Sequence, residues 1–381
     1  MIELNATFWV VTAAAVLLLS MVAPGGIRRA LLAAINLVFV AVLLQGRVVF
    51  VAGGILAVYV LLQAAGRARR VQAALALAMM FLGLLALFLV HKLPAATQSS
   101  RWDAIAPVLA AIGYSYVALR AVDVLKAVYD RRLPAPDPVS LVNYLLPFHM
   151  LAAGPIQSYD EFWAHRDDVA PLSPARVLTA VERIARGLSK KFILAFLLQK
   201  VFLTDFQAGG LYRLWEMQVF FVWLYLDFSA YSDIAVGIGT LLGVVTPENF
   251  DRPLLSRNMI QFWERWHISL SMFVRRQVFI PLQMALMRRT DAAFPLACAI
   301  VATAVAFLVT GLWHGLTIGF LLWGLLQGAG VIVTRLYSQI LQKRLGAKGV
   351  RAYLANPWIQ AAAIVITFEY QAAVLITLFI R

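Results

Sequence analysis

The uncharged run AFPLACAIVATAVAFLVTGLW, residues 293–313, decides the fold class of this chain. It is long enough to cross the ~30 Å hydrocarbon layer of a bilayer as a helix. A second uncharged run, residues 71–90, has the same property. Inside a membrane a chain must satisfy its own backbone hydrogen bonds, and continuous apolar runs do so as α-helices. The two runs therefore predict an all-α, polytopic integral membrane protein.

The composition of the whole chain agrees with this class. Of the 381 residues, 62% are hydrophobic and only 14% are charged, against roughly 25% charged in an average soluble domain. The net charge of +14 does not indicate a nucleic-acid partner, because the basic residues lie in short segments between apolar runs, as the positive-inside bias requires. The single cysteine, Cys298, lies inside an apolar run and fits a small core residue.

The apolar pattern predicts about ten transmembrane helices in one domain. The basic segments Arg120–Arg132 and Arg335–Arg351 are expected to be cytoplasmic loops. We expect peripheral helices in residues 1–120, a catalytic core in 121–334, and a basic loop with a last helix in 335–381. The expected spans are Phe8–Ala23, Ala30–Gly46, Val48–Gly66, Val71–Val90, Trp102–Ala118, Phe192–Phe206, Trp215–Val245, Ala293–Trp313, Leu316–Thr334 and Trp358–Ile380.

Two further segments depart from plain membrane helices. Val139–Phe162 is interrupted by Pro147, Gly154 and Pro155, which predicts a re-entrant or interfacial piece, since broken backbone at membrane depth needs protein or water around it. Pro174–Lys191 is amphipathic and rich in basic residues, which predicts a helix at the cytoplasmic surface.

The stretch QFWERWHISLSMFVRR, residues 261–276, concentrates polar and aromatic side chains in an otherwise apolar chain. On one helix Trp263 and His267 would share a face, as would Phe262 and Trp266, and Arg265 and Ser269, because each pair is four residues apart. This pattern predicts a helix that dips into the bilayer from the cytoplasmic side. The alternative is an interfacial helix whose tryptophans belong to the aromatic belt.

A second histidine, His314, follows Trp313 in an apolar setting. Gly311, Gly315 and Gly319 are four residues apart, and this spacing lines one side of a helix and allows close approach of another backbone. A histidine held there can accept a proton near neutral pH. The alternative is a histidine that is hydrogen-bonded across helices for packing alone. Acids inside a span usually face a bundle interior or a wet cavity, and Asp233 is such an acid.

At these residues the chain resembles the membrane-bound O-acyltransferase family, and most closely its bacterial alginate O-acetylation and D-alanyl transfer branch. The matching blocks are DFSAYSDIAVGIGTLLGVVTPENFDRPLLSRNMIQFWERWHISLS (227–271), FIPL (279–282), GLWHG (311–315), FLLWG (320–324) and FHMLAAGPIQSYDEF (148–162). The resemblance covers residues 114–328. It implies helices around a central tunnel, and transfer of an acyl group from a cytoplasmic thioester to a hydroxyl.

The resemblance also implies roles for single residues. His314 corresponds to the family's catalytic histidine, and we expect it to act as the general base, while His267 lies on the cytoplasmic approach to it. Arg265, Arg275 and Arg276 are expected either to bind donor phosphates or to anchor the chain to anionic lipid. The residues expected to bind substrate or line the tunnel are Trp263, Trp266, Arg265, Ser269, Trp313, Asp233 and Asn249.

The expected partners are membrane lipids, a donor thioester (acetyl-CoA or an acyl carrier protein) and either an acceptor polymer or a periplasmic acyltransferase. No bound cofactor, metal or nucleic acid is expected. The expected location is the bacterial inner membrane.

Three departures bear on the substrate rather than on the reaction. Gln327-Gly328 stands where the family often has His-Gly, and Arg276-Gln277 and Gln157-Ser158 also differ from the usual blocks. Two other functions remain open, namely a transporter or flippase with broken helices and buried acids, and a scaffold without activity.

Overall fold

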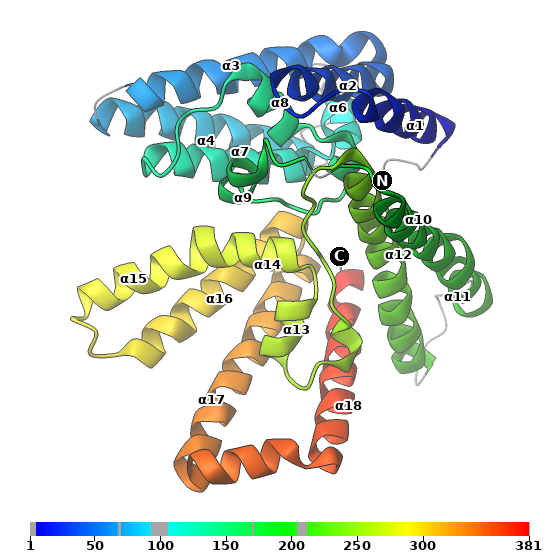
Figure 1. The fold of residues 1–381 in the computed structure, drawn as a ribbon. Helices are drawn as coiled ribbons and strands as arrows, with labels where there is room; N and C mark the ends of the chain where they lie inside the picture. Colours follow the sequence, from blue (N-terminus) through cyan, green and yellow to red (C-terminus); the bar gives the residue numbers. More distant parts are fainter. Residues whose placement is uncertain (1–4, 68–69, 93–105, 170, 204–211, 381) are drawn as a thin grey trace. The chain divides into compact units, whose positions relative to one another are not determined.

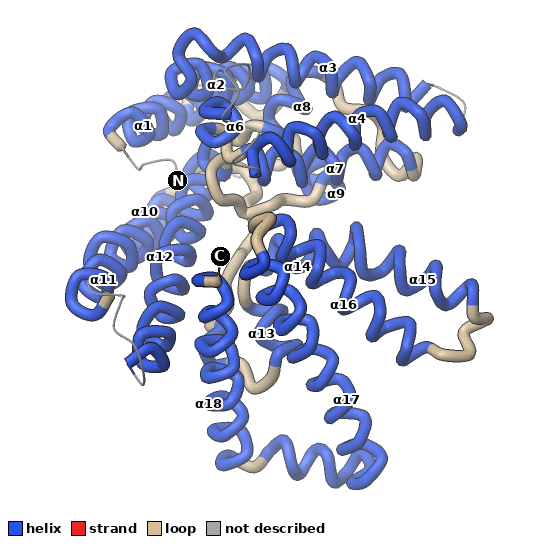
Figure 2. The backbone as a smooth tube through the Cα atoms, turned by 180° about the vertical axis from the view of Figure 1, so that it is seen from behind, coloured by secondary structure: helices blue, strands red, loops and turns tan. Residues whose placement is uncertain are grey.

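A computed structural model describes residues 5–67, 70–92, 106–169, 171–203 and 212–380 of the chain. Within these ranges the backbone forms helices and loops and no strand (Figure 2). A single isolated bridge pairs Phe250 with Trp266. The predicted all-α class is confirmed.

The chain divides into two compact units. The first comprises residues 1–186 and 233–247, and the second comprises 187–232 and 248–381. Two of the three boundaries fall inside α10 (Pro174–Ser189) and α12 (Tyr212–Leu242), and the third follows Pro247 in the loop after α12. The predicted division at residues 120 and 334 therefore has no counterpart in these two units, and it stays a prediction about function.

The first unit contains the N-terminal helices (Figure 1). Within it α3 packs against α4 and α7, and α2 packs against α8. Its elements before α10 are α1 (Ala6–Ser20), α2 (Gly26–Leu44), η1 (Gln45–Arg47), α3 (Val48–Arg67), α4 (Arg70–Lys92), α6 (Ala106–Ala111), α7 (Tyr114–Tyr129), α8 (Pro138–Leu145), η2 (Phe148–Met150) and α9 (Tyr159–His165).

The predicted span Trp102–Ala118 is not one helix. Residues 102–105 lie outside the described ranges, α6 ends at Ala111, and a new helix begins after Gly113. Gly113 has a left-handed φ of +58°, and a Cβ there would lie 2.6 Å from the carbonyl oxygen of Leu151. Glycine is needed here because it alone adopts this conformation readily and brings no side chain into the contact.

The prediction that Arg120–Arg132 forms a loop is also wrong. α7 continues to Tyr129, and Arg120 is completely buried. Its guanidinium donates to the carbonyl oxygens of Leu145, Met150 and Pro155 at 3.3, 2.9 and 3.1 Å. The broken segment after α8 leaves these carbonyls without helical partners, and buried carbonyls need a donor. Arg120 thus organises the interruption that the prolines predicted.

The second unit contains the segments around both predicted histidines. It also holds the part of α12 that ends at Ser232. Its remaining elements are η3 (Lys190–Ala195), α11 (Phe196–Phe202), η4 (Pro253–Leu255), α13 (Met259–Arg265), α14 (Ile268–Val274), η5 (Arg275–Phe279), α15 (Ile280–Arg289), α16 (Pro295–His314), α17 (Ile318–Ala355), α18 (Pro357–Val374) and η6 (Leu375–Phe379).

α16 and α17 form a tight helical hairpin (Figure 1). A Cβ added at Gly311 would collide with the carbonyl oxygen of Phe320, and one added at Gly324 would lie 2.6 Å from the carbonyl oxygen of Phe307. The predicted close approach at Gly311 is therefore confirmed. The predicted glycine ladder on one helix is wrong, because α16 ends at His314 and Gly315 is extended.

The basic segment Arg335–Arg351 is helical rather than a loop. α17 extends to Ala355 and consists of two helical stretches that meet at a kink at Gly346, where φ is +63°. The charged residues in this part of α17 kept the sequence from being read as helix, although Lys, Arg and Leu are good helix formers.

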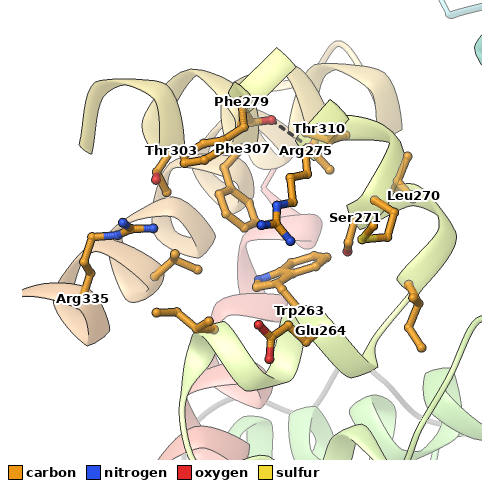
Figure 3. A pocket seen from close by; sticks show the side chains of 16 residues that line it. Trp263, Glu264, Leu270, Ser271, Arg275, Phe279, Thr303, Phe307, Thr310 and Arg335 are labelled. Atoms are coloured by element: carbon orange, nitrogen blue, oxygen red, sulfur yellow. Dashed lines mark hydrogen bonds between the residues drawn. The ribbon is translucent and has the colours of Figure 1, made fainter. Parts of the chain in front are cut away.

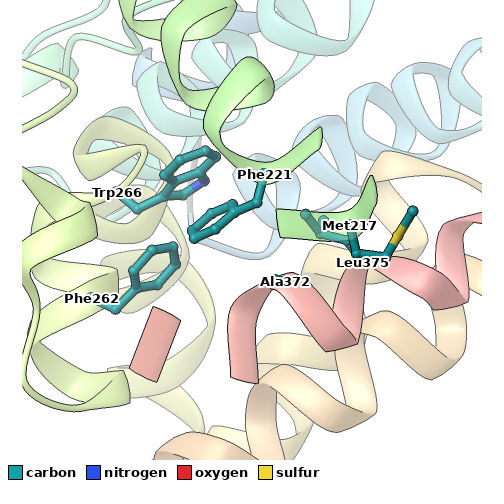
Figure 4. Packing of buried hydrophobic residues seen from close by; sticks show 6 residues of the cluster. All are labelled: Met217, Phe221, Phe262, Trp266, Ala372 and Leu375. Carbon is teal, nitrogen blue, oxygen red and sulfur yellow. The ribbon is translucent and has the colours of Figure 1, made fainter. Parts of the chain in front are cut away.

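An aromatic core joins α12, α13 and the C-terminal elements of the second unit (Figure 4). Phe262 and Trp266 stack with ring centroids 5.4 Å apart, and Phe221 packs against both. Met217, Ala372 and Leu375 complete the cluster. Because large rings bury much apolar area and prefer defined geometries, this core fixes the backbone on which the candidate site is built.

Six helical segments among the described residues are long and apolar enough to cross a membrane. They are Gly26–Leu44, Val48–Arg67, Trp215–Leu242, Pro295–His314, Ile318–Ala355 and Pro357–Phe379. Two shorter apolar helices, Ala6–Ser20 and Ala73–Leu89, add to them. The predicted total of about ten spans stays a prediction.

Candidate active site

The stretch 261–276 is a broken helix, which corrects the prediction of a single one. α13 ends at Arg265, Trp266 is extended, and His267 has a left-handed backbone with φ +45° and ψ 51°. Trp263 and His267 therefore do not pair across a helical turn. A positive φ in a residue other than glycine is strained and persists only where surrounding contacts impose it.

Those contacts come from the segment after α12. The Ile268 N–H donates to the Asn249 carbonyl at 3.0 Å, and the Asp251 N–H donates to the Arg265 carbonyl at 3.0 Å. These two backbone hydrogen bonds hold the chain in place on both sides of the break. They, rather than a position on a helix face, determine where the side chain of His267 lies.

Asn249 fixes the tautomer of His267. It is completely buried, and its Oδ1 accepts from the Ser269 N–H at 3.2 Å and from Ser269 Oγ at 2.8 Å. A backbone N–H only donates, so the atom that receives it is the amide oxygen. The same oxygen lies 3.1 Å from His267 Nδ1, and Nδ1 must therefore carry the proton. In the neutral ring, Nε2 is then the nitrogen with a lone pair.

His267 is held in an apolar environment. Its side chain is buried, and the ring of Phe228 meets it edge-on with centroids 4.8 Å apart. Burial lowers the pKa of His267 well below its usual value of 6.5, and the nearby His314 lowers that pKa further. The ring is therefore neutral at physiological pH.

His314 is the last residue of α16 and is half-buried. Its ring lies edge-on to Trp313 at 4.7 Å and to Trp323 at 5.2 Å, and it stacks on Phe320 at 6.0 Å. The α16–α17 hairpin positions it, because Phe320 and Trp323 lie in the first turns of α17. Cations are stabilised at helix C-termini by the exposed carbonyls, and this position suits a ring that gains positive charge.

The two histidines line one cavity of about 270 Å³ in the second unit. Trp263, Trp266, Phe320 and Trp323 form much of its wall. The structure therefore brings together two titratable groups from the GLWHG and WHIS blocks inside an aromatic enclosure. Such an enclosure with few polar groups is typical of small-molecule sites.

The other predicted site residues do not line this cavity, and some of them contact the two histidines while others do not. Asn249 and Ser269 support His267 directly, and Trp313 contacts His314, but these three do not line the cavity. Arg265 does not line it either. Asp233 belongs to the first unit, where its carboxylate pairs with the guanidinium of Arg183 at 2.5 Å.

Two glutamines hold the tryptophan wall, and sequence reasoning missed this arrangement. Gln327 Oε1 accepts from Trp263 Nε1 at 3.2 Å, and Gln327 Nε2 donates to Gln371 Oε1 at 2.9 Å. Both glutamines are buried, and Gln371 lines the cavity. Gln371 in an apolar helix was the available signal, since buried amides need partners. Gln327 therefore performs a supporting role at the position where the family often has histidine.

The chain matches the profile of the membrane-bound O-acyltransferase family over residues 60–369, which include both histidines and the whole cavity wall apart from Gln371, Leu375 and Leu378. The chain belongs to this family. Among the described residues, no group of three or more His, Cys, Asp or Glu side chains could hold a metal ion.

Several relatives within the family carry names that describe acyl transfer. The chain is 30% identical to a teichoic acid D-alanyltransferase of Streptococcus thermophilus over 68% of this chain and 65% of that protein. It is 28% identical to a probable alginate O-acetylase AlgI of Pseudomonas aeruginosa over 60% of this chain and 43% of that protein. It is 38% identical to a peptidoglycan O-acetyltransferase of Helicobacter pylori over 32% of this chain and 21% of that protein. The chain thus spans about two thirds or less of the length of these relatives.

Proposed function

We propose that this membrane-bound O-acyltransferase family member moves an acyl group, in the first instance acetyl, from a cytoplasmic thioester to a hydroxyl. The acceptor would be a cell-envelope polysaccharide or a partner acyltransferase, and the enzyme would lie in the bacterial inner membrane. The observation that carries the proposal is the single aromatic cavity lined by both His267 and His314. The relatives' activities on teichoic acid, alginate and peptidoglycan support the choice of acceptor class.

His314 would act as the general base. As the acceptor oxygen forms its bond to the thioester carbonyl carbon, the ring takes the hydroxyl proton. When the tetrahedral intermediate collapses, the carbon–sulfur bond breaks and the proton passes to the departing thiolate. A positioned base of this kind contributes typically 10²–10⁴ in rate, and the C-terminal carbonyls of α16 would stabilise the transient imidazolium.

His267 would position a reactant rather than carry the main proton transfer. With Nδ1–H donated to Asn249, the neutral ring offers only an acceptor at Nε2. It can therefore orient a hydroxyl or a water, but it cannot donate a hydrogen bond to the oxyanion while neutral. Burial in this apolar setting lowers the pKa of His267, which makes it a weak base.

The aromatic wall would protect the donor. A thioester hydrolyses if water reaches it during transfer, and excluding water also strengthens the electrostatic interactions inside the site. Apolar and aromatic side chains such as Phe320 form most of the wall, and the polar side chains in the lining include the two imidazoles and the Gln371 amide. The Gln327–Gln371 pair keeps the Trp263 part of this wall in place.

The test uses purified protein, a labelled acetyl thioester and an envelope polysaccharide acceptor. His314→Ala is expected to lower transfer by about 10² or more, with unchanged chromatographic behaviour. His165→Ala is the matched control, because His165 is exposed and far from this cavity in sequence. Wild-type activity in His314→Ala refutes the assignment of the base, and a wild-type protein that never transfers acyl groups favours a transporter or a scaffold.

A further inference from the structure

A second cavity of about 330 Å³ lies in the same unit and shares the wall residue Trp263 with the histidine cavity (Figure 3). α13, α14, η5, α16 and α17 all contribute to its lining. A concave pocket of this size with a largely apolar lining is typical of a small-molecule binding site.

One wall of this cavity is apolar along most of its length. Thr303, Ala306, Phe307 and Thr310 of α16 line it, and their spacing places them on one helix face. The face extends about 10 Å along the axis. The hydroxyls of Thr303 and Thr310 donate to the carbonyls of Ala299 and Ala306, each at 2.8 Å. These threonines therefore use their donors within α16, and the wall suits a hydrocarbon chain.

The polar part of the cavity is cationic. Arg275 and Arg335 enter from η5 and α17, and the only acid in the lining is Glu264 (Figure 3). The Nε of Arg335 is buried and has no hydrogen-bond partner in the described part of the chain. A buried donor that lacks an acceptor is costly. The lining therefore carries a net positive charge, and an anionic oxygen bound there could accept a hydrogen bond from the Arg335 Nε–H.

The position of Arg335 adds a constraint. It directly follows the uncharged part of α17, residues 318–334. Arginine at the end of an apolar segment lies at the level of lipid headgroups, and its planar guanidinium matches phosphate oxygens in geometry. A guanidinium at this point of α17 would meet the phosphate of a lipid whose hydrocarbon chain lies along the apolar part of the helix.

We propose that this cavity binds one membrane phospholipid, with its phosphate at Arg335 and Arg275 and part of one acyl chain along α16. A phosphate on a soluble donor has the same charge chemistry, but it would leave the apolar wall uncovered. The bound lipid would also contact Trp263, which lines both cavities. The proposal concerns binding alone and does not depend on the acyl-transfer chemistry.

The test measures the number of phospholipids retained on purified protein by native mass spectrometry, and then the affinity for phosphatidylglycerol after delipidation. Arg335→Gln removes one of the two cations in the lining and leaves Arg275, and Ala306→Phe fills the cavity without changing charge. Arg344→Gln is the matched control, because Arg344 is an exposed arginine on the same helix. Wild type and Arg344→Gln are expected to retain one lipid, and Arg335→Gln is expected to lose about tenfold in affinity.

Equal retention in wild type, Arg335→Gln and Ala306→Phe overturns the proposal. A second arm adds coenzyme A or inorganic phosphate at millimolar concentration. Neither is expected to displace the lipid, and displacement by either assigns the arginines to a soluble phosphate instead. Acyl transfer is assayed on the same samples, so that an inactive wild type that still binds lipid refutes the proposed function and leaves this inference standing.

Discussion

Replacing Asn249 by alanine tests how the site is built. The substitution removes the oxygen that accepts from His267 Nδ1, the Ser269 N–H and Ser269 Oγ, at 3.1, 3.2 and 2.8 Å. It also removes the Nδ2 donor that Ser232 Oγ accepts at 3.3 Å. Each buried group left unsatisfied costs about 1–3 kcal/mol. Because the hydroxyls of Ser232 and Ser269 can rotate to other partners, we expect a total loss of about 4 kcal/mol.

A native cysteine of the chain can be used to measure this loss of stability. Cys298 is the only cysteine and is buried, so a thiol-reactive dye reports the unfolding of the second unit. A loss of about 4 kcal/mol is expected to lower the apparent melting temperature by about 10 °C, at about 2–4 °C per kcal/mol for units of this size. Ser269→Ala is the graded control, because it removes one of the four hydrogen bonds and is expected to cost about 1 kcal/mol. An Asn249→Ala protein that melts within 2 °C of wild type contradicts the stabilising role assigned to these four hydrogen bonds.

Three further predictions concern stability. Arg120→Leu leaves three buried carbonyls without donors and is expected to destabilise the first unit by about 3–5 kcal/mol, seen as loss of detergent-extractable protein; unchanged yield contradicts this. Gly311→Ala places a Cβ against the Phe320 carbonyl, so the melting temperature should fall by several degrees. Gly53→Ala is the control, because a Cβ at position 53 would meet no other atom within 4 Å and should not lower the melting temperature. Burial and then Arg120 lower the pKa of His149 to about 3. In the unfolded chain His149 therefore binds a proton below about pH 6.5, whereas in the native state it stays neutral down to about pH 3. The free energy of unfolding therefore falls by about 1.4 kcal/mol per pH unit as the pH is lowered from 6.5 toward 3. His149→Gln should reduce this slope, and an unchanged slope would falsify the linkage.

Several of the membrane helices were predictable, because length and the absence of charge are enough to identify an apolar span. Residues 293–313 became α16 and 48–66 became α3, each within a few residues. The break at His267 was not predictable from local pattern, since the Asn249 carbonyl imposes it from outside the stretch. Arg120 was taken for a loop residue because charge normally indicates solvent, and only the unpaired carbonyls of the broken segment explain its burial.

The candidate site was predictable in part and for a different reason. Family resemblance selected His314 and His267, whereas spacing alone left packing histidines as an open alternative. Their presence in one cavity requires the α16–α17 hairpin, which the glycines at 311 and 324 permit but do not by themselves specify. The support of Trp263 by Gln327 and Gln371 joins residues from three helices, and no single segment encodes it.

The most direct test of the central claim is the single-turnover rate of acyl transfer in His314→Ala, with and without added imidazole. We expect a loss of about 10² or more and partial recovery that follows the concentration of neutral imidazole, while His165→Ala transfers at the wild-type rate. Transfer at the wild-type rate in His314→Ala without imidazole would contradict the assignment of His314 as the base.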